Sequence, residues 1–263
     1  MRRIARKNSS VYRGPSTDVS TLVVIPARFA STRFPGKPLA VLAGKPMIQH
    51  VWERSRAAGL EGVIVATEDK RILDACREFG ADVELTSAEH ASGTDRVAEV
   101  AKRHPEYNQV LNVQGDEPGI PAETVRAVAD ALRNPSVNIS TAVAGIRDPG
   151  DLSNPNVVKV VMADSGAALY FSRAGIPFRR DANASAAPPY FRHLGIYGFQ
   201  RDILLKVTQL KPSPLELTES LEQLRWLQAG YRIQCAVVKD FSVGVDTPAD
   251  LKAFEMFMQT QVR

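Results

Sequence analysis

Residues 21–38 read TLVVIPARFASTRFPGKP, a short apolar run followed directly by a loop with two arginines and a lysine. The apolar part is typical of a buried strand, and the loop carries Arg28, Arg33 and Lys37. A triphosphate needs cationic side chains and exposed N–H groups around it, because its charge must be neutralised and its oxygens need hydrogen-bond donors. The stretch therefore predicts a nucleotide-phosphate site at the end of a strand.

This loop does not match a P-loop. That motif requires a glycine, four residues and then Gly-Lys-Ser/Thr, whereas Ser31 stands at the first glycine position and Pro38 follows Lys37. We therefore expect a different class of nucleotide enzyme. The alternative interpretation is a polar surface loop with chance basic residues.

Apolar, strand-like runs alternate with stretches of helical period over the first half of the chain, and the pattern loosens after residue 144. Such βα alternation builds a largely parallel sheet flanked by helices. The predicted strands are 21–25, 63–66, 82–85, 110–113, 139–144, 157–162, 168–171, 194–199 and 233–238. The predicted helices are 46–58, 70–79, 93–103, 122–133, 216–229 and 248–258.

No internal repeat and no linker is visible, so we expect one α/β domain over residues 21–263, preceded by a disordered extension, residues 1–20. Residues 172–190, which include the run ASAAPP, have the composition of a mobile loop. We predict that residues 172–200 form a substrate-facing insertion associated with a dimer contact.

The charge balance argues against a nucleic-acid-binding module. The formal net charge is +4, but residues 1–13 hold five basic residues and no acidic one, which leaves 28 basic against 29 acidic residues elsewhere. The folded body is thus near neutral, and it carries no basic helix or RNA-binding motif.

No run approaches the roughly 20 continuous apolar residues of a membrane span, so we expect no membrane insertion. The N-terminal segment lacks the apolar core of a secretory signal, and we expect a cytoplasmic protein. The Arg- and Ser-containing composition of this segment also resembles that of an organellar transit peptide, although we favour a disordered N-terminal extension of a bacterial protein. Cys76 and Cys235 are expected to be buried free thiols in a reducing compartment.

Two carboxylates follow strand-like runs and are candidates for holding a metal ion. Asp116 comes after a buried strand within NVQGDEP, and Asp246 lies in GVDTP. Mg²⁺ prefers one or two carboxylates and completes its shell with water and substrate phosphates. Each aspartate also has an ordinary interpretation as a helix cap, and only their pairing raises the metal hypothesis above it.

Seven motifs, in order along the chain, together resemble the 3-deoxy-manno-octulosonate (Kdo) cytidylyltransferase family, also called CMP-Kdo synthetases. They are PARFASTRFPGKP (26–38), SGTDR (92–96), NVQGDEP (112–118), YFSR (170–173), RHLGIYG (192–198), PLE with LEQLR (214–225) and GVDTP (244–248). Other sugar nucleotidyltransferases share the arginine-rich loop, but the ordered set is specific.

This resemblance implies a three-layer αβα fold with a mostly parallel mixed sheet, of the nucleotide-diphospho-sugar transferase type. It implies that the anomeric hydroxyl of Kdo attacks the α-phosphate of CTP, giving CMP-Kdo and pyrophosphate for lipopolysaccharide biosynthesis. It further implies Mg²⁺ as the cofactor and a homodimer.

The resemblance also assigns roles to residues, motif by motif. Five residues are implied in catalysis. Arg28, Arg33 and Lys37 are implied in binding the triphosphate, and Asp116 and Asp246 in coordinating Mg²⁺. The residues implied in binding CTP are Ala27, Arg28, Ser92, Gly93, Arg96 and Gln114. The residues implied in binding the sugar acid, whose carboxylate suits arginine and whose hydroxyls suit the others, are Arg173, His193, Tyr197, Glu222 and Gln223.

Other interpretations stay open at this point. Without the resemblance, His193 and Tyr197 are ordinary structural residues, and Glu222 and Gln223 belong to a solvated helix face. A transferase for another nonulosonate, such as a sialic-acid-type sugar, has a similar pattern, and an 8-amino analogue of Kdo is a second possible substrate. A nucleotide-binding protein without activity is the alternative from another class, and the two aspartates argue against it.

Overall fold

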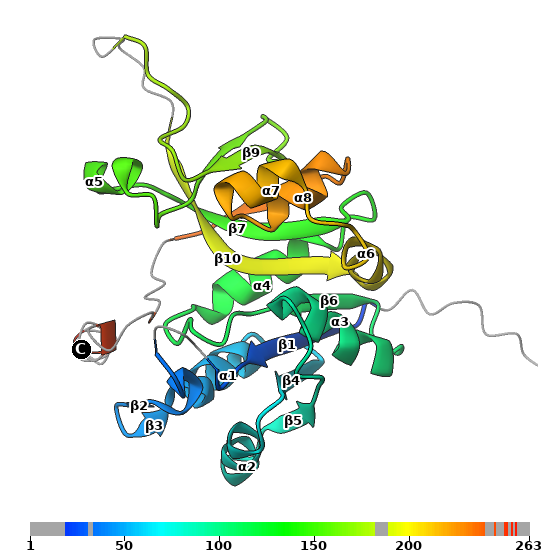
Figure 1. Ribbon diagram of the computed structural model, residues 1–263. Helices are drawn as coiled ribbons and strands as arrows, with labels where there is room; N and C mark the ends of the chain where they lie inside the picture. The colour runs from blue at the N-terminus through cyan, green and yellow to red at the C-terminus, as the bar shows by residue number, and fades with distance from the viewer. Residues whose placement is uncertain are drawn as a thin grey trace, which may run out of the picture.

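The computed structural model describes residues 19–30, 34–181 and 189–239, together with Val245, Asp250, Leu251, Phe254 and Met256 (Figure 1). The expected extension, apart from Val19 and Ser20, lies outside these residues, and so do Arg33 and Asp246.

Within the described residues, nine strands form one mixed sheet (Figure 1). Seven of them follow the order β11-β7-β10-β6-β1-β4-β5, and β8 and β9 extend the sheet from β10. Only β10 runs antiparallel to its neighbours in that row of seven; the other pairs are parallel. The strands are β1 (Thr21–Ala27), β4 (Gly62–Thr67), β5 (Asp82–Leu85), β6 (Gln109–Asn112), β7 (Ile139–Gly145), β8 (Lys159–Met162), β9 (Ala168–Ser172), β10 (Phe191–Gln200) and β11 (Ile233–Val237), with a separate pair β2 (Val41–Leu42) and β3 (Lys45–Pro46).

Helices cover both faces of the sheet, and alternate residues of β1 show this directly. Leu22 and Val24 belong to the core that also contains residues of α3, α6 and α8, whereas Val23 and Ile25 belong to the core that contains residues of α1, α2 and α4; all four side chains are fully buried. The two-residue side-chain period of a strand thus supplies two cores, and the predicted three-layer αβα fold is confirmed. The helices are α1 (Met47–Ala57), α2 (Lys70–Glu78), α3 (Gly93–Arg103), α4 (Ala122–Ala131), α5 (Pro149–Ser153), α6 (Arg201–Val207), α7 (Pro214–Glu219) and α8 (Gln223–Gln228), with a 3₁₀ turn η1 (Lys37–Leu39).

Most predicted elements are present within a few residues, but the single helix predicted over 216–229 is wrong. The structure has two short helices there, α7 and α8. A capping box between Ser213 and Glu216 starts α7 earlier than predicted, and Ser220 takes a left-handed conformation with φ of 52° that ends it. The prediction also missed α5, α6 and the β2–β3 pair.

The last 10 residues of the insertion predicted over residues 172–200 form a strand of the sheet. Residues 191–200 are β10, which pairs with β6 on one side and with β7 on the other. Its apolar side chains enter both cores, Ile196 on one face and Phe199 on the other, so this segment belongs to the sheet itself. Residues 182–188 of the expected loop lie outside the described part of the chain.

Both cysteines are buried and free, as predicted. Burial raises the pKa of each thiol, Cys76 and Cys235, to about 12, so neither forms a reactive thiolate near neutral pH. Across the described ranges, no helix has both the length and the apolar character needed to cross a bilayer.

Candidate functional site

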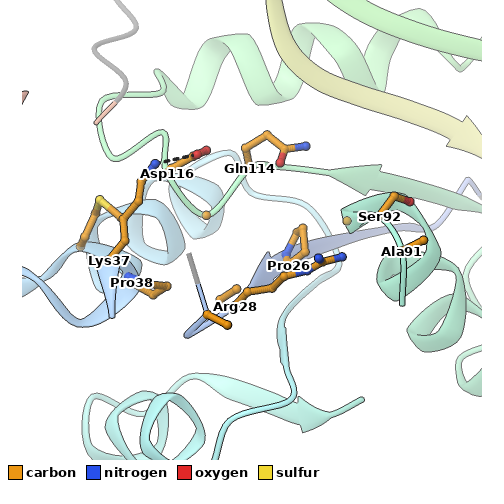
Figure 2. A pocket seen from close by; sticks show the side chains of 13 residues that line it. Pro26, Arg28, Lys37, Pro38, Ala91, Ser92, Gln114 and Asp116 are labelled. Atoms are coloured by element: carbon orange, nitrogen blue, oxygen red, sulfur yellow. Dashed lines mark hydrogen bonds and ion pairs between the residues drawn. The ribbon is translucent and has the colours of Figure 1, made fainter. Parts of the chain in front are cut away.

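An open cleft lies where β1 and β6 end and α3 begins (Figure 2). In parallel α/β sheets, ligands bind beyond the carboxyl ends of the strands, which is where this cleft opens. Its volume is about 330 Å³. It is lined by Pro26, Ala27, Arg28, Ala30, Lys37, Pro38, Met47, Ala91, Ser92, Gly93, Gln114, Gly115 and Asp116.

Seven of the residues predicted from the sequence line this cleft: Ala27, Arg28, Lys37, Ser92, Gly93, Gln114 and Asp116. They come from three segments that are distant in sequence, and the parallel sheet brings them together because consecutive strands end at the same edge. Arg33 and Asp246 lie outside the described residues. The structure therefore gathers most of the predicted nucleotide residues into one place.

Lys37 and Asp116 form an ion pair at one side of the cleft, with Nζ and Oδ2 2.9 Å apart (Figure 2). The side chain of Lys37 is 9% exposed and that of Asp116 is 44% exposed, so the carboxylate is the half that solvent or a ligand reaches. Gly36 determines the backbone conformation just before Lys37, because the φ of +72° at Gly36 starts η1. A Cβ added at Gly36 would lie 3.1 Å from the Phe29 ring.

Asp116 is the one predicted metal ligand that the structure describes, and its partly exposed carboxylate offers oxygen atoms of the kind that Mg²⁺ prefers. Among the described residues, no three His, Cys, Asp or Glu side chains gather into a group that could hold a metal ion. The backbone N–H of Val245 donates to the Asp116 carbonyl oxygen at 3.0 Å, and Val245 is buried beside Met47. Val245, the second residue of GVDTP, thus contacts the loop that carries Asp116.

The first turn of α3 faces the cleft. Ser92 caps the helix by accepting from the N–H of Asp95, and the Asp95 side chain accepts from the N–H of Ser92 in return. Ser92 and Gly93 both line the cleft. A helix N-terminus presents free N–H groups and positive potential, which favour an anionic ligand.

Arg96 does not line the cleft, although the sequence predicted it to bind CTP. Its side chain is 1% exposed, and Nη2 lies 2.7 Å from Oε2 of Glu68. Its other terminal nitrogen, Nη1, donates to the hydroxyl of Thr86. Burial lowers the pKa of Arg96, and Glu68 opposes that shift. The structure therefore places Arg96 in an internal ion pair beneath the site.

A row of hydrogen bonds leads from the cleft to a second group of predicted residues. Gln114 Nε2 donates to Asn112 Oδ1 at 3.3 Å, and Asn112 Nδ2 lies 3.5 Å from the Thr94 hydroxyl. That hydroxyl donates to Glu222 Oε2 at 2.7 Å. Burial raises the pKa of Glu222. Thr94 and Asn112 were not among the individual site residues predicted from the sequence, although both lie inside the motifs SGTDR and NVQGDEP.

His193 and Tyr197 lie on β10 and pack against each other, with ring centroids 5.3 Å apart. The Nε2 atom of His193 is 2.9 Å from the Thr141 hydroxyl. Burial lowers the pKa of His193 to about 3, so its imidazole is neutral near pH 7. Burial raises the pKa of Tyr197 well above its usual value, and nearby Glu222 adds to that shift.

Arg173 directly follows β9, and its side chain contacts the turn between α7 and α8. Its guanidinium donates to three backbone carbonyl oxygens, those of Glu219 at 2.7 Å, Pro155 at 2.9 Å and Ser220 at 3.3 Å. A guanidinium has five N–H donors, so two of them are not used in these contacts. The side chain of Glu219, which the sequence did not single out, accepts a hydrogen bond from the backbone N–H of Arg173 at 2.9 Å. Gln223 begins α8 and is buried.

The comparisons with known proteins agree with this arrangement. A family model described as "Cytidylyltransferase" matches residues 22–233. The 3-deoxy-manno-octulosonate cytidylyltransferase of Solibacter usitatus is 49% identical over 243 residues, which cover 92% of this chain and 95% of that protein. The protein of the same name from Zea mays is 46% identical and covers 95% of this chain and 85% of its own length.

Two solved structures have the same fold. The structure of a CMP:2-keto-3-deoxy-manno-octonic acid synthetase in complex with CTP is 41% identical, has a TM-score of 0.87, and covers 92% of this chain and 99% of its own. A cytidylyltransferase from Leptospira borgpetersenii, 16% identical with a TM-score of 0.60, covers 90% of this chain and 86% of its own; it shows the fold alone.

The mixed sheet, with a cationic cleft at its strand ends, defines a nucleotide-binding α/β protein, and the matches above define its family. The chain belongs to the cytidylyltransferase family, and within it to the 3-deoxy-manno-octulosonate cytidylyltransferases.

Proposed function

We propose that the protein transfers CMP from CTP to the anomeric hydroxyl of Kdo, giving CMP-Kdo and pyrophosphate for lipopolysaccharide biosynthesis. The observation that carries this proposal is the row of hydrogen bonds from Gln114 through Asn112 and Thr94 to Glu222, because it joins a cleft suited to a nucleotide to the residues expected to bind the sugar acid. The names of the relatives agree with this reaction and this substrate.

In this reaction the residues of the cleft act mainly by position and charge. Phosphoryl transfer spreads charge over the transferred group and the leaving pyrophosphate, so fixed cations stabilise the transition state. Arg28 and Lys37 supply those cations, with Arg33 as a third expected from the sequence. Ser92, Gly93 and the amide of Gln114 are suited to the cytidine part.

We infer that Asp116 and Asp246 hold Mg²⁺ together. The hydrogen bond from Val245, the residue before Asp246, to the Asp116 carbonyl oxygen supports this pairing. When bound, the ion supplies positive charge to the triphosphate and orients its phosphates. Lys37 already holds one oxygen of Asp116, which fixes the direction of the carboxylate.

The proposed binding site for the sugar acid lies around the α7–α8 turn and β10. The two unused donors of Arg173 suit its carboxylate, whereas neutral His193 can only exchange hydrogen bonds with its hydroxyls. Tyr197, Glu222 and Gln223 complete the proposed site. We further propose a cytoplasmic homodimer, as the resemblance implies; the two buried free thiols suit a reducing compartment.

The test is pyrophosphate release by the purified protein with CTP and Mg²⁺, comparing Kdo, its 8-amino analogue, a sialic acid and no sugar, with UTP as the control nucleotide. We expect release with Kdo and CTP. Pyrophosphate release only with a different sugar acid would replace Kdo as the proposed substrate. If the protein binds CTP but releases no pyrophosphate with any of the acids, a nucleotide-binding role without catalysis would be favoured.

The tight packing of Gly115 predicts that Gly115→Ala raises the KM for CTP by about tenfold. A Cβ at this position would lie 2.7 Å from the backbone carbonyl oxygen of Pro26, which cannot rotate away, so the loop that carries Gln114 and Asp116 must shift. The assay above measures the change. Gly145→Ala is the matched control, since its Cβ would meet nothing within 4 Å; equal KM values in the two variants would show that the loop position is unimportant.

A further inference from the structure

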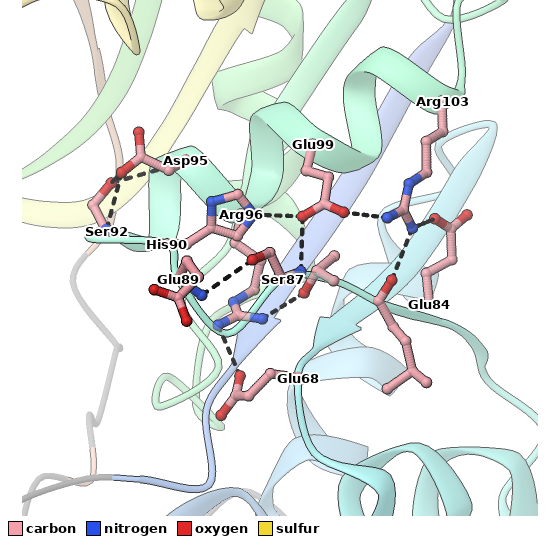
Figure 3. Close-up of polar contacts among 12 residues, drawn as sticks. Glu68, Glu84, Ser87, Glu89, His90, Ser92, Asp95, Arg96, Glu99 and Arg103 are labelled. Atoms are coloured by element: carbon pink, nitrogen blue, oxygen red, sulfur yellow. Dashed lines mark hydrogen bonds and ion pairs between the residues drawn. The ribbon is translucent and has the colours of Figure 1, made fainter.

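One face of α3 carries four polar residues at helical spacing, namely the cap Ser92 and then Arg96, Glu99 and Arg103 (Figure 3). Residues three or four apart lie on the same side of a helix. This side meets the end of β5: Arg103 Nη1 donates to the Leu85 carbonyl oxygen at 2.8 Å and to Glu84 Oε2 at 3.0 Å. We call this side the polar face of α3.

Glu99 is the centre of this face (Figure 3). Its Oε2 accepts the backbone N–H of Ser87 at 3.0 Å and also contacts Nε2 of His90. Its Oε1 pairs with Arg103. These contacts lower the pKa of Glu99 in spite of its burial, so the side chain is a carboxylate at neutral pH. One carboxylate thus holds both ends of segment 87–90.

The far end of that segment reaches the cleft. The His90 carbonyl oxygen accepts a hydrogen bond from Nη2 of Arg28 at 2.9 Å. The next two residues, Ala91 and Ser92, line the cleft itself. The guanidinium of Arg28 therefore takes its direction from a carbonyl whose own residue is fixed by Glu99.

We propose that Glu99 is a positioning residue that, through His90, aims Arg28 at the nucleotide phosphates. Arginine has many rotamers, and fixing one of them before the ligand arrives removes an entropy loss that binding would otherwise carry. This inference rests on the proposed function in one respect, namely that CTP is the ligand of Arg28.

The test is a double-mutant cycle read by calorimetric titration with CTP in the absence of sugar. Glu99→Ala should weaken CTP binding about tenfold, because a charge-assisted hydrogen bond network is lost. In an Arg28→Ala background the same substitution should change the dissociation constant by less than about twofold, since the side chain that it positions is gone. Equal effects of Glu99→Ala in both backgrounds, or no effect in either, would overturn the proposal.

One control and one substitute variant keep the result interpretable. Glu78→Ala removes an exposed glutamate of α2 that lines no part of the cleft, and its CTP affinity should equal that of the wild type. If Glu99→Ala does not fold, His90→Ala tests the same link while keeping the carbonyl, and its effect should again vanish without Arg28. Wild-type protein that does not bind CTP would contradict the proposed function, whereas additive effects in protein that binds CTP contradict the positioning role alone.

Discussion

Asparagine in place of Asp116 should lower kcat for pyrophosphate release by about 100-fold or more, which is the range seen when a group that stabilises transition-state charge is lost. Asparagine keeps an oxygen that can accept from Lys37 Nζ, now 2.9 Å from Oδ2, so the local geometry survives while the negative charge is removed. Because the side chain is 44% exposed, stability should change by less than about 1 kcal/mol.

Two measurements separate the metal role from a structural one. The Mg²⁺ concentration for half-maximal rate should rise in Asp116→Asn, and the thermal midpoint should stay within a few degrees of wild type. Asp74→Asn is the matched control, since Asp74 also pairs with a lysine, Lys70, but on the surface of α2. Full activity in Asp116→Asn would remove this carboxylate from the reaction.

The sequence was a good guide to the cleft for a physical reason. Arg28, Lys37 and Asp116 all follow apolar runs that end at one edge of a parallel sheet, so a pattern that predicts the strands also predicts where these side chains meet. The two cores follow from an equally local property, because consecutive apolar residues of β1 point to opposite faces of the sheet.

Contacts between elements were not predictable in this way. The SGTDR motif contains both Ser92, which lines the cleft, and Arg96, which does not, because residues four apart share a helix face but lie about a full turn apart along it. The contact between Glu99 and His90 depends on how the segment after β5 packs on α3. The break between α7 and α8 depends on the left-handed Ser220, a conformation that non-glycine residues rarely adopt.

Arg96→Met should lower the free energy of unfolding by about 3–5 kcal/mol, the usual result of removing one partner of a buried ion pair. Methionine fills most of the space of the arginine stem, but it leaves the Glu68 carboxylate, whose side chain is 17% exposed, without the cation 2.7 Å away. Urea unfolding measures the change. Lys70→Ala breaks an exposed pair instead, and should change stability by less than about 1 kcal/mol.

A second substitution distinguishes this structural role from the nucleotide-binding role predicted from sequence. Glu68→Gln removes the stranded charge yet keeps an oxygen for the N–H of Phe29, which Glu68 now accepts at 3.1 Å. The double variant Arg96→Met/Glu68→Gln should therefore recover part of the stability lost in the single variant, because no unpaired carboxylate remains. If Arg96→Met were as stable as wild type and lost only CTP affinity, the guanidinium would have to contact the nucleotide, and the internal ion pair would not be its function.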